Sequence, residues 1–470
     1  MQPLKGLKVV DLTTFLATPT TGRILGEWGA DVIKVEAFKG DPCRTNQALV
    51  FGMPSSDEEN LAFDVANFHK RFVALNLKSE KGNEVMMKLL EDADVFITNT
   101  RTKSLAKMGL DWESLHAKFP RLIMGHGLGY GKKGPEKDAA GFDVTCYMGR
   151  GGVFGTTFNK GDSPMIPTNG YGDYQCSVFL VAGILAALQG REKTGEGDYV
   201  TCALQHAGIY TLATGMISAQ YGNPYPKSRL EVNNPLNNVF RSKDQKWVVL
   251  CLPEYDRDWP RVMHLIGRDE LAEHPDYSCC QTVNDKGLAP EVVKILDDGF
   301  AQFTREELLK MFSENDMPCE PAQTPTDIYE DQNALINEYI KPVQYPAGPR
   351  WCPTAPVQFE LGETEDLIPG GKLGSATEDV MKELGYSEDE IKAAEAEGAV
   401  AQVRRLQAAG VPLSEIAILY RTNSQSEVFE QALAGAQIGY LVRGGERFFE
   451  LAAFAAGFLK ARGNDDEPLD

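Results

Sequence analysis

LKVVDL at residues 7–12 and DVIKVE at residues 31–36 are the two stretches that decide the fold. Both are short, rich in valine and apolar, as expected for buried strands. Pro19 suits the first turn of a helix between them, and Gly29 follows the end of that helix. A strand, a helix and a second strand in this order predict a parallel pair within an α/β sheet.

The same alternation continues downstream. We expect further strands at residues 72–77, 94–99 and 121–125, with helices at 80–93 and 111–118. These elements predict an α/β fold with a mainly parallel sheet. Ligands of such sheets bind beyond the carboxyl ends of the strands, so the loops after Leu12, Glu36, Leu77 and Asn99 are the expected contact sites.

The chain divides into three regions by composition. Residues 1–215 together with 325–400 are expected to form a large domain, in which 376–397 reads as an acidic helical pair. Residues 216–324, with Pro/Asn-rich segments and a strand at 247–252, are expected to form a smaller α/β domain. Residues 401–470 differ from the rest: we expect a helix at 402–409 and strands at 415–420 and 438–443.

Charge and cysteine usage limit the possible functions. The net charge of -20 argues against non-specific nucleic-acid binding, which depends on Lys and Arg contacts to phosphate. Nine cysteines without zinc-site spacing indicate reduced thiols and a cytoplasmic location. The first residues lack an apolar signal core, and the apolar run at 178–188 is too short to span a bilayer, so no membrane contact is expected.

Asp173 is the candidate reactive residue. It closes the run Asn169-Gly170-Tyr171-Gly172-Asp173, just before the apolar stretch at 178–188, which predicts a buried helix. Asp is a preferred N-cap, so Asp173 can simply cap that helix. It can also be a nucleophile on a glycine-rich turn. The local pattern leaves both interpretations open.

Most motifs that would indicate another chemistry are absent from the sequence. There is no GxxxxGK[ST], no GxGxxG after a strand, no HExxH and no GxSxG. Gly125-His126-Gly127-Leu128-Gly129-Tyr130-Gly131 reads as a loop close to a ligand or another backbone, or as a plain turn. The six histidines are isolated, so we expect no metal and no redox cofactor. A carboxylate nucleophile without metal or ATP suits near-thermoneutral exchange, such as passing coenzyme A (CoA) between acids.

Several motifs, in order, resemble the class III CoA-transferases. They are residues 3–12, 29–36, 107–112, 120–123, 141–143, 169–173 and 193–197. The resemblance runs from residue 1 to about 400, and 128–135 with 219–223 resemble the branch that acts on 2-hydroxy acids. It implies a Rossmann-like large domain, an interlocked homodimer, and acyl-CoA and carboxylic acid substrates without a cofactor.

The resemblance places the nucleophile on Asp173. It implies attack on the donor thioester, an aspartyl anhydride, and then an aspartyl-CoA thioester that the acceptor acid opens. The glycines beside Asp173 are expected to supply backbone N–H groups that hold the oxyanion.

Contacts to CoA and to the acid follow from the same resemblance. The expected CoA contacts are Leu16, Ala17, Leu75, Asn76, Leu77, Lys78, Asn99, Thr100, Arg101 and Lys107. Lys78, Arg101 and Lys107 would meet the CoA phosphates. Phe15, Asn233 and Asn234 are the expected acid contacts. Leu16 stands where formyl-CoA transferase has glutamine, and 232–234 lacks the family's glycine run, which indicates a larger, more apolar acyl group.

Two alternatives remain beside the transferase. An acyl-CoA racemase of the same fold needs a His/Asp acid–base pair, for which His126 is the nearest candidate. The second alternative is DNA binding through the tail, because 418–426 and 440–449 resemble part of a UvrD-type helicase. The tail lacks most of a motor domain, so we expect an inert, poorly packed appendage.

Overall fold

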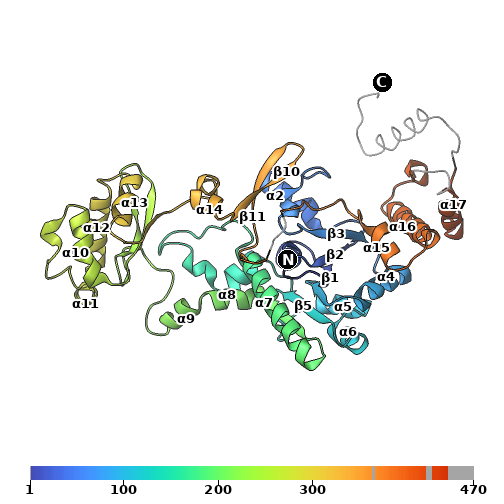
Figure 1. The fold of residues 1–470 in the computed structure, drawn as a ribbon, viewed down its shortest axis with the longest axis horizontal. Coiled ribbons are helices and arrows are strands. Elements are labelled where there is room, and N and C mark those ends of the chain that lie inside the picture. The colour runs from blue at the N-terminus through green and yellow to red at the C-terminus, as the bar shows by residue number, and fades with distance from the viewer. Residues whose placement is uncertain (1, 363–365, 420–425, 443–470) are drawn as a thin grey trace, which may run out of the picture.

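A six-stranded parallel sheet lies at the centre of the protein's larger body (Figure 1). The computed structural model describes residues 2–362, 366–419 and 426–442. The strand order is β3-β2-β1-β4-β5-β6. The strands are β1 (Lys8–Leu12), β2 (Asp31–Glu36), β3 (Lys70–Ala74), β4 (Val95–Thr98), β5 (Ile123–Leu128) and β6 (Tyr199–Ala203). The expected α/β class is confirmed. Chain order reverses between β1 and β4, which is where such sheets bind ligands.

Helices cover both faces of this sheet. On one face, α1 (Pro19–Glu27) and α7 (Tyr171–Thr194) share an apolar core with β1, β2 and β4. On the other face, a second core joins the strands to α4 (Glu80–Glu91), α5 (Thr102–Met108), α6 (Trp112–Lys118), α15 (Thr377–Glu383) and α16 (Glu388–Ala408). The sheet is therefore the middle of three packed layers.

Some expected elements differ in extent. Strand β3 ends at Ala74, so residues 75–77 lie in the following loop instead of the strand. The glycine-rich run at 125–131 is not wholly a loop, because its first four residues complete β5 and are buried. Helix α5 and strand β6 were not expected, since neither has a long periodic apolar pattern.

Helix α7 is longer and less buried than the apolar run at 178–188 indicated. It spans 24 residues, and Val178 and Phe179 on it are exposed. By length and composition it is the one helix in the described part of the chain that could cross a membrane, so the expectation that this region is too short is corrected. Leu180, Val181 and Ile184 nevertheless pack against the sheet, as in the core helix of a globular domain.

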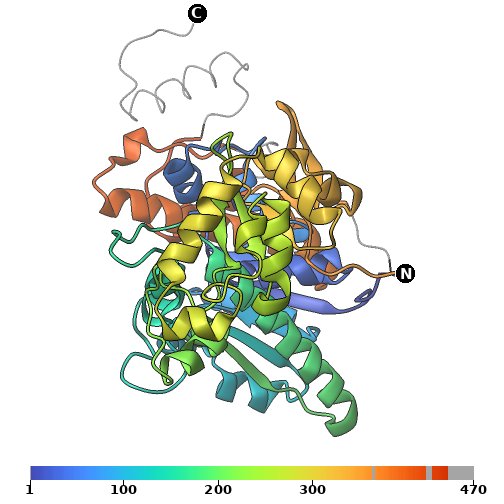
Figure 2. The same ribbon diagram turned by 90° about the vertical axis from the view of Figure 1, so that its left-hand side faces the viewer.

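A second unit lies beside the body and is joined to it by two passages of chain (Figures 1 and 2). Its antiparallel sheet contains β7 (Asn237–Arg241), β8 (Trp247–Cys251) and β9 (Cys319–Pro321). The helices α10 (Tyr255–Leu265), α11 (Cys280–Asp285), α12 (Ala289–Phe300) and α13 (Arg305–Ser313) complete a core of its own. The chain then returns through α14 (Gln332–Ile336) and the hairpin β10 (Ile340–Tyr345) and β11 (Gly348–Pro353).

The C-terminal region is helical where it is described. The helix expected at 402–409 is the end of the continuous α16, and α17 (Ser426–Gly435) packs on it through Val403 and Leu433. The strands expected at 415–420 and 438–443 are wrong for residues 415–419 and 438–442. Glu415 ends a short 3-10 turn, and residues 416–419 and 438–442 are irregular chain. Their remaining residues lie outside the described part. Without neighbouring strands, these apolar runs pack against helices instead.

Candidate active site

A small cavity lies at the point where the strand order reverses. Its volume is about 100 Å³, and it is lined by the ends of β1, β4 and β5 and the start of α7. Five of the expected site residues meet there: Phe15, Leu16, Ala17, Asn99 and Asp173. Residues from three distant parts of the chain are thus brought to one place.

Asp173 enters this cavity from the first turn of α7. The residue that caps the helix is Gly170, in the left-handed region with φ 105°, and Asp173 is the third helical residue. The N-cap interpretation of Asp173 is therefore wrong. Its half-buried carboxylate accepts no hydrogen bond from the described residues, and remains available for chemistry.

The glycine turn before Asp173 is held by Asp143. The backbone N–H groups of Gly170 and Gly172 each donate to the Asp143 carboxylate over 2.8 Å. A side chain at position 172 would meet Tyr147 at 2.1 Å, so only glycine fits against that ring. The two glycine N–H groups expected to hold the oxyanion are consequently occupied.

The ionisation of Asp173 is shifted toward neutrality. Burial raises its pKa to about 7, and the nearby charge of Asp143 adds to the effect. Burial also raises the pKa of Asp143 itself. A carboxylate that is costly to ionise is more basic and more nucleophilic than an exposed one.

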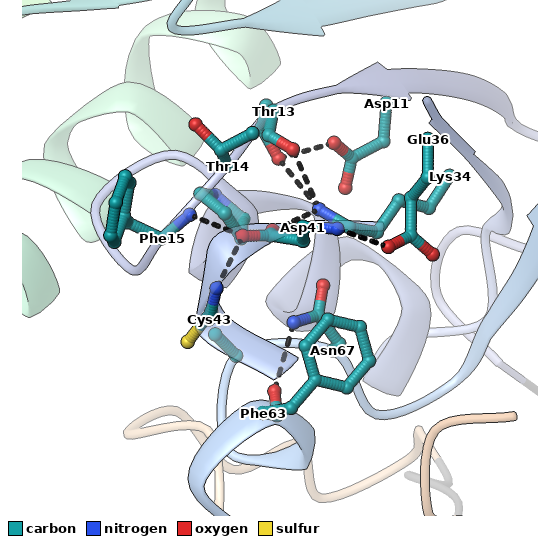
Figure 3. A network of polar contacts seen from close by, with 12 residues as sticks. Asp11, Thr13, Thr14, Phe15, Lys34, Glu36, Asp41, Cys43, Phe63 and Asn67 are labelled. Carbon is teal, nitrogen blue, oxygen red and sulfur yellow. Dashed lines mark hydrogen bonds and ion pairs between the residues drawn. The ribbon is translucent and has the colours of Figure 1, made fainter. Parts of the chain in front are cut away.

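The loop after β1 forms the opposite wall. Phe15 lies in the left-handed region with φ 64°, which is uncommon for a bulky residue. Its backbone N–H donates to Asp41 over 3.1 Å, as Figure 3 shows. Asn99 holds Thr14 from both sides, accepting from its N–H at 3.0 Å and donating to its carbonyl at 2.7 Å. Asn99 thus shapes the cavity through the loop.

Buried charged side chains lie beside the same loop, and Figure 3 shows Asp11, Lys34 and Asp41 among them. Lys34 and Asp41 form an ion pair of 3.1 Å, and Lys70 and Asp11 form one of 2.8 Å, with all four side chains fully buried. Lys34 also donates to the carbonyl of Thr13 over 2.8 Å. Burial lowers the pKa of Lys70 to about 8. The Lys34–Asp41 pair therefore contacts the loop at two points, the carbonyl of Thr13 and the N–H of Phe15.

Leu16 lies on the wall of the small cavity and also packs into an apolar cluster. It is 6% exposed, and it packs with Cys43, Phe63 and Phe72. The polar glutamine of formyl-CoA transferase is therefore replaced here by a side chain that belongs to an apolar cluster.

A larger cavity of about 480 Å³ lies at the same edge of the sheet, beyond β3. Of the expected CoA contacts, Leu75 and Asn76 line it, together with Phe38 and residues of α16. Leu77 packs on the core under α4. Lys78, Arg101 and Lys107 are exposed, and none of the three forms an ion pair within the described ranges. Thr100 directs its carbonyl to His126.

His126 and the two expected asparagines lie elsewhere. Both ring nitrogens of the fully buried His126 are engaged, with Tyr199 at 2.8 Å and Thr100 at 2.9 Å, and burial lowers its pKa to about 4. His126 is also absent from the lining of the Asp173 cavity, so the structure does not favour it as a racemase acid–base partner. Asn233 bonds to Asn223, and Asn234 bonds to Leu252, so neither meets Asp173 within one chain.

Phe142 and Asp143 lie within the motif at 141–143, and neither residue was assigned a role from the sequence. The ring of Phe142 meets that of Phe15 edge-on at 5.7 Å, on the cavity wall. Nothing in the local sequence signals either contact, since both partners are more than 25 residues away. In the described part of the chain no three His, Cys, Asp or Glu side chains gather as metal ligands would.

Comparison with known proteins gives consistent results. The model of CoA-transferase family III matches residues 4–375, and the model of the UvrD-like helicase C-terminal domain matches 370–454, beginning earlier than the boundary expected at 401. The chain is 40% identical to cinnamoyl-CoA:phenyllactate CoA-transferase of Clostridium sporogenes, over 82% of this chain and 94% of that protein.

Two further relatives extend this comparison. (R)-2-hydroxy-4-methylpentanoate CoA-transferase of Clostridioides difficile is 38% identical, over 83% of this chain and 97% of that protein. The crystal structure of a CAIB/BAIF family protein from Brucella suis superposes with a TM-score of 0.69 at 28% identity, covering 82% of this chain and 99% of that one.

Proposed function

This chain belongs to CoA-transferase family III, and from that premise we propose that it passes CoA from an acyl-CoA to a 2-hydroxy acid, with Asp173 as nucleophile. Transfer of CoA between acids follows from the family and its named relatives. The finer proposal rests on one observation: Asp173 projects, without a hydrogen-bond partner among the described residues, into a largely apolar cavity at the sheet's switch point. Two of its relatives are named for 2-hydroxy acids.

The first half of the reaction loads the enzyme. The Asp173 carboxylate attacks the thioester carbonyl, the C–S bond breaks, and an acyl-aspartyl anhydride and CoA thiolate form. The thiolate then attacks the aspartyl carbonyl, which yields an aspartyl-CoA thioester and releases the first acid as its carboxylate. Splitting the exchange in this way replaces one difficult step by easier ones.

The second half repeats these steps with the acceptor. The carboxylate of the 2-hydroxy acid attacks the aspartyl-CoA carbonyl, which gives a second anhydride and free thiolate. Attack of the thiolate on the acyl carbonyl of this anhydride forms the new acyl-CoA and restores Asp173. No proton, electron or cofactor is consumed, so the proposal requires no cofactor.

The two cavities suggest how CoA would lie. Both are at the carboxyl edge of one sheet, with the larger one beyond β3 and the smaller one between β1, β4 and β5. We place the acyl group beside Asp173 and the nucleotide end toward Leu75 and Asn76. Lys78 on the loop after β3, Arg101 at the start of α5 and Lys107 on α5 are exposed and would neutralise the phosphates.

A homodimer is part of the proposal. Tyr174, Val178 and Phe179 on α7, with Tyr210 on α8 (Leu204–Thr211) and Ile217 on α9 (Ala213–Ala219), leave an apolar surface exposed. Contiguous apolar surfaces of this kind mark protein interfaces. A second copy of the chain would cover it, and would be the source of Asn233 and Asn234 at the site. The nine free cysteines fit a cytoplasmic enzyme.

Replacing Asp173 tests the proposal. The wild type, incubated with an acyl-CoA and a 2-hydroxy acid such as 2-hydroxy-4-methylpentanoate, should release a new acyl-CoA. Hydroxylamine added to the enzyme with acyl-CoA alone should leave a hydroxamate on the peptide that contains Asp173, identified by mass spectrometry. Asp173→Asn should lose transfer and the hydroxamate together, because the amide cannot form the anhydride.

Asp162→Asn is the matched control, since this aspartate is exposed and lies outside the cavity. It should transfer at the wild-type rate. Turnover by Asp173→Asn comparable with that of the control would exclude Asp173 as the nucleophile.

A further inference from the structure

Thr18 carries a buried hydroxyl without a partner. The residue is 1% exposed, and its Oγ1 has no hydrogen-bond partner in the described structure. Leaving such a group unpaired costs roughly 1–3 kcal/mol, so natural proteins retain few of them. An unpaired buried hydroxyl therefore indicates a partner that comes from outside the chain.

Thr18 lies at the start of α1, where a hydrogen bond to its hydroxyl group is especially expected. It is the N-cap of α1, where a threonine hydroxyl ordinarily accepts a backbone N–H of the first turn. Here the backbone of Thr18 is itself in the αR region, and no side-chain cap bond forms. The neighbouring Thr20 and Thr21 do pair their hydroxyls, with the carbonyls of Leu16 and Ser177.

The hydroxyl lies on the wall of the Asp173 cavity. Thr18, Gly127 and Asp173 all line this space of about 100 Å³. A side-chain carbon at position 127 would lie 1.9 Å from Thr18 Oγ1, so the glycine of β5 leaves room for the hydroxyl. A group bonded to Asp173 within this cavity therefore enters the space that Thr18 lines.

Two backbone donors close to Asp173 are already in use. The N–H groups of Gly170 and Gly172 bind Asp143. The start of α1, by contrast, faces the cavity with Leu16, Ala17 and Thr18, and a helix N-terminus favours negative charge. The hydroxyl therefore lies where developing charge is stabilised.

We propose that Thr18 donates a hydrogen bond from its hydroxyl to the acyl oxygen while Asp173 attacks the thioester. The hydrogen bond strengthens as that oxygen gains negative charge in the tetrahedral intermediate, and no proton is transferred. The acyl oxygen gains this charge in the first and the last of the four steps, so Thr18 acts in these two steps. This inference rests on the transferase function proposed above.

Thr18→Val tests the inference, since valine has nearly the same shape without the hydroxyl. The measurements are kcat and KM for transfer, together with the thermal midpoint of unfolding. We expect kcat to fall about a hundredfold, as on removal of one oxyanion donor, with little change in KM. The thermal midpoint of unfolding should not fall, because the substitution removes a hydroxyl that forms no hydrogen bond. Thr18→Ser should recover most of the rate.

Thr21→Val is the matched control on the same helix. Thr21 is fully buried, but its hydroxyl bonds to the carbonyl of Ser177 at 3.2 Å. We expect its unfolding midpoint to fall while kcat stays close to that of the wild type. Opposite responses in the two variants separate a catalytic hydroxyl from a structural one.

Three results would overturn the inference. The first is a wild-type kcat in Thr18→Val. The second is a thermal midpoint of Thr18→Val so much lower that unfolding accounts for the lost activity. A loss confined to 2-hydroxy acids, with the acids that lack the hydroxyl unaffected, would assign Thr18 to substrate recognition instead. Absence of transfer in the wild type and in Thr21→Val would contradict the proposed function itself, and is distinguishable from all three.

Discussion

The Asp41 carboxylate accepts the backbone N–H of Phe15 over 3.1 Å, and Phe15 is held in the left-handed region. The same carboxylate forms a buried ion pair with Lys34. One side chain therefore links the charge balance of the core to the wall of the candidate active site. The link explains why a residue as bulky as Phe15 keeps a conformation that costs free energy.

Asp41→Asn should destabilise the protein while preserving the cavity. The amide oxygen can still accept from Phe15, but the fully buried Lys34 loses its ion-pair partner and keeps only the more distant charges of Asp11 and Glu36. Breaking one side of such a pair costs about 3–5 kcal/mol. We expect a lower midpoint of denaturant unfolding with nearly wild-type kcat. Asp41→Ala loses both interactions, and should also raise KM for the acid.

Asp298→Asn provides the comparison, because the pair between Lys294 and Asp298 is exposed on α12. Its unfolding midpoint should change little. Equal effects of Asp41→Asn and Asp298→Asn would contradict the buried role assigned to Asp41.

The pH dependence of transfer should report the ionisation of Asp173. Only the carboxylate attacks, and burial, with Asp143 second, raises its pKa to about 7. The value of kcat/KM should therefore rise tenfold per pH unit below about 7 and level off above it. Cys43, Cys176 and Tyr174, whose pKa values are raised, stay neutral through this range.

Asp143→Asn should shift the rise of kcat/KM to lower pH, because the negative charge beside Asp173 is removed. It should also reduce kcat, since an amide cannot accept from both Gly170 and Gly172. Profiles of kcat/KM measured between about pH 5 and 9, with Asp162→Asn as control, show whether the rise in rate moves to lower pH. A rise of kcat/KM at the same pH in Asp143→Asn and Asp162→Asn would show that Asp143 has no electrostatic role.

Phe142→Ala should weaken selection for large apolar acids. The ring of Phe142 packs edge-on against Phe15 on the cavity wall. Its loss should lower kcat/KM for 2-hydroxy-4-methylpentanoate relative to glycolate about tenfold, as expected for one apolar contact. Phe38→Ala, in the larger cavity, should instead raise KM for acyl-CoA and leave this ratio unchanged.

Exposed apolar residues on α7 predict a dimer in solution. Light scattering should give twice the chain mass of 51.7 kDa. Phe179→Arg places a charge in the proposed interface, and should shift the protein toward monomer. Lys193→Ala, an exposed change near the other end of α7, should leave the mass unchanged. A wild type that stays monomeric at micromolar concentration would exclude the interface.

Two truncations should separate the parts of the C-terminal region. A chain ending at residue 410 loses α17 but keeps α16, and should retain kcat/KM within about twofold, since the lost contacts form a separate small cluster. A chain ending at residue 387 also loses Ile391 and Ala394, which line the larger cavity, so KM for acyl-CoA should rise. Equal behaviour of the two chains would show that α16 does not contribute to that cavity.

Much of the six-stranded sheet could be predicted from the sequence, because its strands carry a local signal. Buried parallel strands need continuous apolar runs, so 7–12 and 31–36 could be recognised locally, and β2 has the expected bounds. Strand β6 was missed because its residues are only half-buried at the sheet edge. The strands expected in the C-terminal region are wrong because an apolar run becomes a strand only where another strand pairs with it.

Sequence alone determined the parallel sheet, the edge at which ligands bind and, through ordered motifs, the family and Asp173 as the residue to test. These features depend on local periodicity and motif order, which the chain carries within short segments. Only the tertiary structure decided that Asp173 is not an N-cap, that Asp143 occupies the glycine N–H groups, that His126 is fully engaged and that Thr18 keeps an unpaired hydroxyl at the cavity. Burial and hydrogen-bond partners arise from segments far apart in the chain, so they exist only once it is folded.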